Sequence, residues 1–443
     1  MTEWRSTTLG QLCATGEASI QTGPFGSQLH AHEYADQGIG VVPTEAIAAR
    51  RLEAAKLVKV PDDVANRLRR HTLKAGDIVF ARRGVQATGH SALVTQAFAG
   101  SLCGTGVIRL RLASDGIDAT YLSFFLTSPP TFEWIRTNAV GAVMPSLNKE
   151  ILQRLPIVLP PLVEQHSIAY LLGALDDKIE LNREMNRTME DTAQALFRSW
   201  FVDFDPVVAK ADGRKPFGMS NEMAALFPTH FEETELASIP SGWRWKPISE
   251  AFNVNPKGPL IKGEEAPYLS MQDAPTHSAI PECWGTRAFG SGTTFQNGDT
   301  LIAKITPCLE NGKGAFIVDL EPGQVGWGST EFIVLRSRAP LTPEHAYFLS
   351  RLDDFRAHLV ANMSGSSGRQ RVSMGALDHF HCCVAPPPVH AAFGLLTTPL
   401  MTAIAAGTAE SRTLADLRDL LLPKLLSGEI RVRQAEQQVE AVL

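Results

Sequence analysis

The sequence lacks the local motifs of the common catalytic and metal-binding sites. None of its six cysteines stands in a C-x-x-C spacing, so neither a disulfide framework nor a zinc knuckle is indicated. There is no G-x-S-x-G nucleophile elbow, no H-E-x-x-H helix and no G-x-x-x-x-G-K-[ST] phosphate loop. No Pro-Pro pair follows an Asn or Asp, as the loop of an amino-methyltransferase would require. We therefore predict no catalytic residues, no metal site and no cofactor.

Long hydrophobic runs and a strong charge of either sign are also missing. We find no apolar run as long as a membrane span and no basic-then-apolar N-terminus, so we expect a cytoplasmic protein without a membrane partner. The net charge is −6, and 443 residues suit two or three domains. Residues 1–155 hold 16 Lys and Arg against 13 Asp and Glu, whereas residues 156–240 hold 7 against 14. The acidity is therefore central, and the first segment is mildly basic.

The stretch from Pro160 to Pro206 carries the strongest helix signal. No proline interrupts it after Pro161, and Leu, Ala, Glu, Met and Arg dominate its composition. Apolar and small residues recur at heptad spacing, which is typical of a helix that pairs with another helix. The predicted pairing residues are Ile168, Leu172, Leu175, Ile179, Asn182, Asn186, Met189 and Leu196. The two asparagines would disfavour slipped pairings, because an amide buried opposite leucine has no partner. An ordinary surface helix is the alternative, since short heptads resemble a 3.6-residue stripe.

The segments before and after this helix contain the same landmarks in the same order. Gly76-Asp77 precedes a short apolar strand, as Gly298-Asp299 does. Residues 104–111 are echoed by 329–336, and the helix expected from Tyr121 to Arg136 is echoed from Tyr347. In the first copy, residues 151–159 are expected to form the last strand. This order of landmarks indicates an internally duplicated, mixed α+β chain.

A second long helix is predicted over residues 389–428, with Pro399 expected to kink it or delay its start. Its predicted pairing residues are Leu396, Leu400, Leu414, Leu417 and Leu421. The predicted organisation is a first globular domain (1–159), a central helix (160–206), a linker (207–240), a second globular domain (241–385), a distal helix (386–430) and a tail (431–443). The two helices most simply pair with each other as an antiparallel coiled coil.

With these features in view, the chain resembles the specificity subunits of type I restriction–modification systems. The stretches that carry the resemblance are LPPLVEQHSIAYLLGALDDKIELN, LFRSWFVDFDP, IPSGW and LRDLLLPKLLSGEIRV. The resemblance implies that each globular domain is a target-recognition domain that reads one half of a bipartite double-stranded DNA target. It also implies that the paired helices act as a spacer. The implied partners are methylation subunits, two of them, and restriction subunits in the full complex. Such a chain directs adenine methylation and restriction without catalysing either.

Candidates for DNA contact are basic or amide side chains at strand ends and in glycine-rich loops. Side chains of these types pair with guanine or adenine edges or with phosphate. They are Arg82 and Arg83 after the first Gly-Asp strand, Lys304 after the second, Lys313, and Arg369, Gln370 and Arg371 in the loop 364–371. For each of them a solvated surface charge is the alternative.

Two other clusters are interpreted as structural. His379, His381 and Cys383 alternate on one face of a strand, a spacing that can bind zinc, but a strand with a buried thiol is the favoured interpretation. His30, His32 and Glu33 are expected in a polar surface loop. Two other functions stay open at this point. One is an enzyme whose domains bind a methyl donor or cut DNA; the other is a protein-interaction scaffold without a DNA role.

Overall fold

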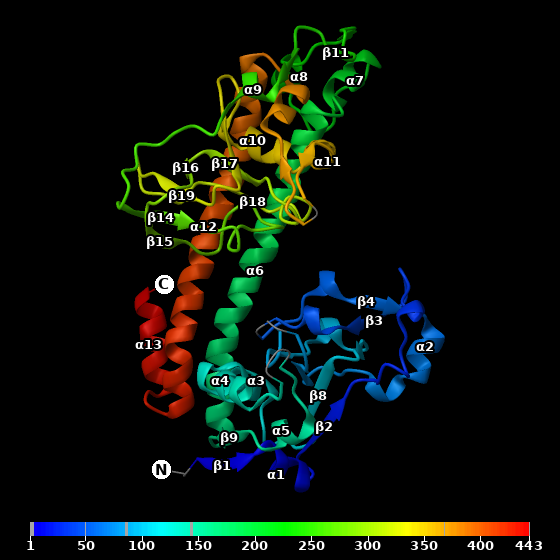
Figure 1. Cartoon of the computed structure of the whole chain (residues 1–443), viewed down its shortest axis with the longest axis vertical. Coiled ribbons are helices and arrows are strands. Elements are labelled where there is room, and N and C mark those ends of the chain that lie inside the picture. The colour runs from blue at the N-terminus through cyan, green and yellow to red at the C-terminus, as the bar shows by residue number, and fades with distance from the viewer. Residues whose placement is uncertain (1–3, 49, 85–86, 142–144, 367, 443) are drawn as a thin grey trace. The chain divides into compact units, whose positions relative to one another are not determined.

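The computed structural model describes residues 4–48, 50–84, 87–141, 145–366 and 368–442. The chain divides into two compact units (Figure 1). Unit 1 comprises Met1–Asp177 and Leu414–Leu443, and unit 2 comprises Lys178–Thr413. Two long helices contribute to both units: α6 (Leu162–Phe201) and α12 (Pro387–Ser427). Each unit thus holds one globular domain and one segment of each long helix.

Unit 1 is built on two small sheets. Its strands are β1 (Arg5–Thr8), β2 (Ala18–Thr22), β3 (Ile39–Val42), β4 (Val58–Val60), β5 (Ile78–Ala81), β6 (Ser91–Leu93), β7 (Leu102–Cys103), β8 (Val107–Leu112) and β9 (Pro156–Leu159). The larger sheet has the order β2-β8-β5-β6, and the smaller one has the order β4-β3-β7. In the smaller sheet, β3 pairs antiparallel with β4 and parallel with β7. Strand β1 pairs with β9, which leads directly into α6.

The helices of unit 1 cover these sheets and their connections. They are α1 (Leu9–Ala14), α2 (Asp62–Arg67), α3 (Ala119–Thr127), α4 (Pro129–Asn138), α5 (Lys149–Gln153) and α13 (Val432–Val442), with 3₁₀ turns η1 (Ala31–Glu33), η2 (Thr44–Ala46), η3 (Ala54–Lys56), η4 (Arg69–His71) and η5 (Gln96–Phe98). The core under the larger sheet includes Val79, Ala81 and Val107, all fully buried.

Unit 2 repeats this plan. Its strands are β10 (Phe231–Glu232), β11 (Ile239–Pro240), β12 (Arg244–Pro247), β13 (Phe252–Val254), β14 (Glu265–Leu269), β15 (Gly285–Ala288), β16 (Thr293–Phe295), β17 (Asp299–Ala303), β18 (Gly314–Phe316), β19 (Gly326–Gly328), β20 (Phe332–Ser337), β21 (Met363–Ser364), β22 (Arg371–Val372) and β23 (His381–Val384). It has two four-stranded sheets, β13-β20-β17-β18, the counterpart of β2-β8-β5-β6, and β15-β14-β19-β16. Strand β14 pairs antiparallel with β15 and parallel with β19, as β3 does with β4 and β7. Strands β12 and β23 pair as β1 and β9 do.

The remaining helices of unit 2 are α7 (Asp205–Ala211), α8 (Asn221–Ala225), α9 (Ile248–Ala251), α10 (Pro343–Ser350), α11 (Asp353–Ala361) and η6 (Met374–His379). An aromatic core that includes Phe197, Trp200 and Phe393 joins α6 and α12 to the sheet. The segment 207–240 holds α7, α8, β10 and β11. There Phe227 is buried and Phe231 is partly buried, whereas Phe217 is fully exposed.

The same turn and ion pair begin the central strand of each sheet. Gly76 and Gly298 both have φ of +87°, a conformation that favours glycine. Asp77 accepts two hydrogen bonds from Arg111, at 2.7 and 2.6 Å. Asp299 accepts two from Arg336, at 2.7 and 2.8 Å. Both aspartates are buried, so each pair replaces the solvation that its carboxylate has lost. The predicted mixed and internally duplicated fold is confirmed.

Several sequence-based boundaries are wrong. The helix expected from Tyr121 to Arg136 is two helices, α3 and α4, because Pro129 and Pro130 lack the N–H groups that would continue it. Residues 149–153 form α5 rather than a strand, because the Asn148 side chain accepts a hydrogen bond from Ile151 N–H at 2.8 Å and caps a helix. The distal helix α12 begins at Pro387 and continues through Pro399, so Pro399 does not delay its start.

Helix α12 also differs from the expectation about membrane spans. By length and composition alone it is apolar enough to cross a membrane. Within unit 2 its residues Val389, Phe393 and Met401 are instead part of the aromatic core.

Candidate nucleic-acid interface

In unit 1, β5 ends and β8 begins at the same edge of the larger sheet. We call this end of the sheet the loop edge. Strands β5 and β8 are antiparallel, with Ile78 facing Leu110 and Ala81 facing Val107. The loop edge therefore lies at the end of the sheet opposite the Asp77–Arg111 pair. Arg82 N–H donates to Gly106 O at 2.8 Å, and Arg83 forms a β-bridge with Ser146. The predicted residues Arg82 and Arg83 therefore stand on a hydrogen-bonded strand end.

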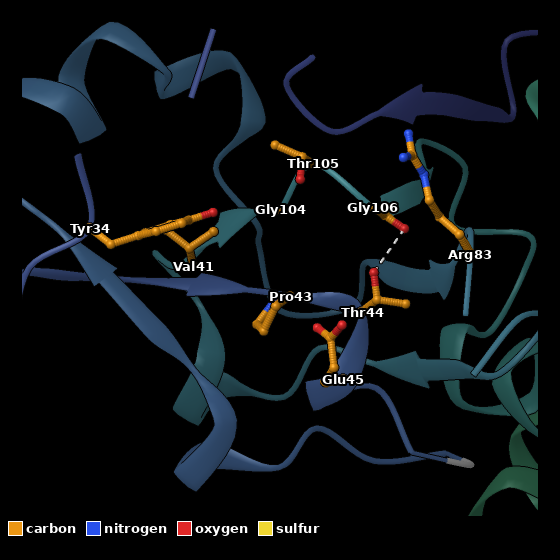
Figure 2. Close-up of a pocket in the computed structure, with 9 residues that line it drawn as sticks. All are labelled: Tyr34, Val41, Pro43, Thr44, Glu45, Arg83, Gly104, Thr105 and Gly106. Carbon is orange, nitrogen blue, oxygen red and sulfur yellow. Dashed lines mark hydrogen bonds between the residues drawn. The ribbon is translucent and has the colours of Figure 1, made fainter. Parts of the chain in front are cut away.

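The two arginines have different surroundings. Arg82 is partly buried, and its Nε donates to Leu147 O at 3.1 Å, so this side chain is fixed inside the domain. Arg83 is exposed and lines a cavity of about 230 Å³. Figure 2 shows the residues that line it, from three separate segments: Tyr34, Val41, Pro43, Thr44, Glu45, Arg83, Gly104, Thr105 and Gly106. Thr44 Oγ1 donates to Gly106 O at 3.4 Å and ties two of these segments together.

This cavity combines donors and acceptors. The Arg83 guanidinium donates, the Glu45 carboxylate accepts, and Thr105 and Tyr34 carry hydroxyl groups that do both. Such a set can contact base edges and backbone phosphates alike. Tyr34, Glu45 and Thr105 were not predicted from the sequence, because no local spacing links the segments that carry these cavity residues.

Unit 2 has the equivalent loop edge, where β17 ends and β20 begins. Lys304 N–H donates to Glu331 O at 2.9 Å, as Arg82 N–H does to Gly106 O. Ile305 forms a β-bridge with Arg371, as Arg83 does with Ser146. Val372 N–H donates to Lys304 O at 2.9 Å, as Leu147 N–H does to Arg82 O at 2.8 Å. The structure thus brings Lys304 and Arg371 to one edge.

Lys313 has a different role from the other predicted contacts. Its ammonium donates to the carbonyl oxygens of Met271 and Gln272, both at 2.8 Å. Two of its three donors therefore hold a loop within unit 2, and we leave Lys313 out of the proposed interface.

The hairpin β21–β22 carries the other predicted residues. Arg369 is exposed and Gln370 is partly buried, and Thr306 N–H donates to Gln370 O at 3.1 Å. Arg371 is also exposed, but its guanidinium is bound to Glu331. The predicted loop 364–371 includes Ser367, which lies outside the described residues.

The predicted pairing residues of α6 lie mostly on a buried face. In unit 1, Ile168, Leu172 and Leu175 are buried, as are Leu414, Leu417 and Leu421 of α12. In unit 2, Ile179 and Asn182 are buried, and Asn186, Met189, Leu196 and Leu400 are partly buried. Leu396 is 38% exposed and was misplaced. The buried residues of that part of α12 are Phe393, Thr397, Met401 and Ile404, one position out of phase with the predicted set.

Polar contacts show the antiparallel pairing of α6 and α12 within each unit. In unit 2, Asn182 Nδ2 donates to Glu410 Oε2 at 2.8 Å, and Asn186 Nδ2 donates to Thr408 Oγ1 at 3.2 Å. In unit 1, Arg418 pairs with Asp176. Residue numbers thus rise along α6 as they fall along α12.

Of the predicted histidine and cysteine cluster, His381 and Cys383 belong to the β12–β23 pair, whereas His379 ends the 3₁₀ helix η6 and does not lie on that strand. His381 lies opposite Pro247, and Cys383 lies opposite Trp245. Burial raises the pKa of the Cys382 thiol to about 12 and raises that of Cys383 further. Within the described ranges, no group of three His, Cys, Asp or Glu residues could hold a metal ion.

Comparison with known proteins agrees with this duplicated architecture. Residues 46–190 match the family described as "Type I restriction modification DNA specificity domain". The type I restriction enzyme HindI specificity subunit of Haemophilus influenzae is 23% identical over 359 residues, which cover 70% of this chain and 77% of that protein. The MjaIX specificity subunit of Methanocaldococcus jannaschii is 22% identical over 325 residues, covering 73% and 72%.

A solved structure supports the fold over the whole length. The S subunit of a type I restriction–modification system from M. genitalium has a TM-score of 0.54 at 15% identity and covers 96% of each chain. The chain is therefore a DNA-sequence-recognition protein with a duplicated domain. Residues 46–190 carry the type I restriction modification DNA specificity domain, and most of the chain is similar to type I restriction–modification specificity subunits, which are the non-catalytic subunits of their systems.

Proposed function

We propose that the globular domain of each unit reads one half of a bipartite double-stranded DNA target through its loop edge. The observation that carries this proposal is the repetition of one edge geometry in both units. Arg82 and Lys304 have equivalent backbone partners. Arg83 and Arg371 lie on equivalent β-bridges, Arg83 on the side of the central strand and Arg371 on the opposite side. The side chains at these edges differ between the units, as two readers of different sequences require.

We further propose that α6 and α12 set the distance between the half-sites and dock two methylation subunits. Helix α6 has large apolar side chains that are exposed in each unit. Val163 and Tyr170 are each 79% exposed in unit 1, and Leu181 and Met185 are 50% and 51% exposed in unit 2. Exposed apolar side chains at helical spacing suit a partner surface. In this proposal the complex methylates adenine in the cytoplasm and adds restriction subunits for cleavage.

The test is the methylated motif produced by the complex. The chain and its methylation subunits are co-expressed in a host without other methylases, and methylated positions are mapped by sequencing. We expect adenine methylation at a split target, and none from the purified chain alone. Arg82→Ala with Arg83→Ala should relax one half-site, and Arg369→Ala with Arg371→Ala should relax only the other.

Each lost base contact should cost about 1–3 kcal/mol of discrimination, whereas a lost phosphate contact should weaken binding to all sequences alike. Relaxation of both halves by either pair of substitutions would contradict two independent readers. A complex that purifies intact but methylates without sequence preference would support the rival interpretation of a scaffold with no DNA role.

A further inference from the structure

An ion pair lies on the loop edge of unit 2. Arg371 Nε donates to Glu331 Oε1 and Oε2 at 2.9 and 3.0 Å, and Nη2 donates to Glu331 Oε1 at 2.7 Å. The contact is two-pronged, which fixes the plane of the guanidinium as well as its position. Arg371 belongs to β22, and Glu331 directly precedes β20.

The pair is not part of the duplicated framework. In unit 1, the residue equivalent to Glu331 is Gly106, because each accepts the N–H of the residue after the central strand. The residue equivalent to Arg371 is Ser146. Arg371 forms a β-bridge with Ile305, which follows Lys304, and Ser146 forms one with Arg83, which follows Arg82. Glycine and serine thus suffice to build the same edge in unit 1. The pair in unit 2 is therefore not required by the fold and is a candidate for a property in which the two units differ.

Two hydrogen bonds fix the backbone of Glu331 at the loop edge. Glu331 N–H donates to Ser329 Oγ at 3.1 Å, and Glu331 O accepts from Lys304 N–H. The Glu331 side chain is 22% exposed, whereas that of Arg371 is 49% exposed. The carboxylate is thus the shielded member of the pair, and the guanidinium is the member that a ligand can reach.

The guanidinium keeps free donors after it has bound Glu331. Arginine has five N–H donors, and Glu331 occupies those on Nε and one side of Nη2. Within the described residues, the edge formed by Nη1 and the other side of Nη2 keeps its donors, apart from a long 3.5 Å contact of Nη1 with Arg369 O. Two parallel donors on one edge match the O6 and N7 acceptors of guanine in the major groove.

Charge favours a base over a phosphate as the ligand. A guanidinium that is already paired with a carboxylate has little net charge left to attract a phosphate. Guanine is a neutral ligand, and two hydrogen bonds to it require a guanidinium with a fixed orientation. Glu331 fixes that orientation.

We propose that Arg371 reads a guanine in the half-site of unit 2, with Glu331 as the positioning residue. This inference rests on the proposed function and adds to it the identity of one base and a residue that the sequence analysis did not select. The competing interpretation is a clamp that only fastens the β21–β22 hairpin to β20.

The experiment uses the complex with methylation subunits and maps the methylated motif of Arg371→Gln, Arg371→Lys and Glu331→Gln. Arg371→Gln should lower the preference for guanine at one position of one half-site by roughly tenfold or more. Arg371→Lys should do the same, since lysine keeps the charge but lacks the two-donor edge. Glu331→Gln should weaken the preference at the same position and increase the salt dependence of DNA binding, because the unpaired guanidinium then attracts phosphate.

The matched control is the pair Arg5–Glu17 in unit 1, whose side chains are also 49% and 22% exposed. Its two hydrogen bonds are both 2.8 Å. Glu17 precedes β2 at the end of the sheet that holds Asp77, away from the loop edge. Glu17→Gln should leave the motif and the salt dependence unchanged.

Three outcomes would overturn the inference. One is an unchanged motif in Arg371→Gln, and another is full guanine preference in Arg371→Lys. The third is a change in thermal stability alone, which the clamp predicts. In each case the wild-type split motif would leave the proposed function intact; only a wild-type complex without a split motif would refute that function.

Discussion

At the scale of single residues, His345 and His390 form a buried pair in unit 2. Their ring centroids are 5.1 Å apart, and both side chains are fully buried. His390 Nε2 accepts from Ala385 N–H at 3.0 Å, but within the described part of the chain neither nitrogen of His345 has a hydrogen-bond partner. Burial lowers the pKa of His390 to about 4 and lowers that of His345 well below its usual value. Both rings are therefore neutral at pH 7.

The sign of the pH effect follows from these directions. A histidine whose pKa is lower in the folded state binds its proton more readily in the unfolded state. Its contribution to stability is complete above the unfolded pKa of about 6.5 and is lost as the pH falls toward the folded pKa. For His390 this window extends from about pH 6.5 to about pH 4. At about 1.4 kcal/mol per pKa unit, His390 alone contributes roughly 3 kcal/mol over this window.

We predict that His345→Leu reduces the acid sensitivity of the chain without destabilising it at pH 7.5. Leucine is close to histidine in size and has no polar atoms to leave unpaired beside Phe197 and Phe201. The free energy of unfolding, measured by urea titration at pH 7.5 and 5.0, should fall less with acidification in the variant. The exposed His277 provides the control, and His277→Leu should retain the wild-type pH dependence. A loss of more than about 2 kcal/mol at pH 7.5 would mean that His345 makes an essential polar contact.

The sequence predicted site residues only where a local signal exists. In each unit a Gly-Asp turn predicts the apolar strand that follows it. The place of Arg82, Arg83 and Lys304 at a strand end was therefore predictable, because these residues directly follow the two strands. Glu331 was not, because its importance comes from Arg371, 40 positions away. Lys313 was predicted as a DNA contact, and only the folded chain shows the two carbonyl oxygens that it binds.

At the scale of elements, the pairing of α6 and α12 in unit 2 depends on a close approach at Gly407. A Cβ atom on Gly407 would lie 2.8 Å from Asn186 Oδ1. Asn186 would then have to rotate and lose its bond to Thr408 Oγ1. Apart from the backbone of its own helix and its two chain neighbours, no atom of the described residues lies within 4 Å of the equivalent position on Gly173 in α6. Alanine at Gly173 therefore changes helix propensity alone, whereas alanine at Gly407 changes helix propensity and also the packing against Asn186.

We predict opposite outcomes for alanine at these two glycines. Gly173→Ala should stabilise unit 1 by up to about 1 kcal/mol, the gain of alanine over glycine inside a helix. Gly407→Ala should fall short of that gain by about 1 kcal/mol or more, because a hydrogen bond is lost. Adding Asn186→Ala to Gly407→Ala should cost less than Asn186→Ala alone, since the clash is gone. Urea titrations of the four variants measure the coupling, and strict additivity would show that the helices separate freely at this point.

The error at Leu396 has a physical cause in the same element. Strict heptad spacing from the leucines near residue 414 selects Leu396 and Leu400, because leucine is the most obvious core residue. The folded chain instead buries Thr397, whose Oγ1 donates to Phe393 O at 3.0 Å and so needs no partner outside its helix. A threonine that satisfies itself in this way gives no hydrophobic signal in the sequence.

At the scale of the whole molecule, the duplication was predictable from the order of landmarks, although few residues are identical. What repeats is the set of positions that the backbone needs: the Gly-Asp turn, the arginine that pairs with the aspartate, and the strand that leads into a long helix. The loops at the two edges do not repeat, which is why their contacts had to be read from the folded chain.

Each of the two long helices has residues in both units. Helix α6 contributes residues 162–177 to unit 1 and residues 178–201 to unit 2. An inserted heptad adds about 10.5 Å of helix at 1.5 Å per residue and keeps the buried stripe in phase to within about 20°. B-DNA rises about 3.4 Å per base pair, so one heptad corresponds to about three base pairs.

We predict that a heptad inserted between Asp177 and Lys178, with another between Thr413 and Leu414, lengthens the unread spacer of the target by about one to three base pairs. These positions lie where each helix passes from one unit to the other, between the Asp176–Arg418 and Lys178–Glu410 pairs. The half-site sequences should not change, because neither loop edge is altered. DNA bending can absorb part of the change at a cost of a few kcal/mol, which sets the lower end of the range. The methylated motif of the variant is the measurement.

The control for this prediction is the insertion in α6 alone. It should abolish methylation or destabilise the chain, because the two helices no longer match in length and the buried contacts of one unit fall out of register. If the double insertion instead gives full activity with an unchanged spacer, the distance between the half-sites is set outside these helices. If the single insertion gives the same longer spacer as the double insertion, the separation depends on α6 alone and not on its pairing with α12.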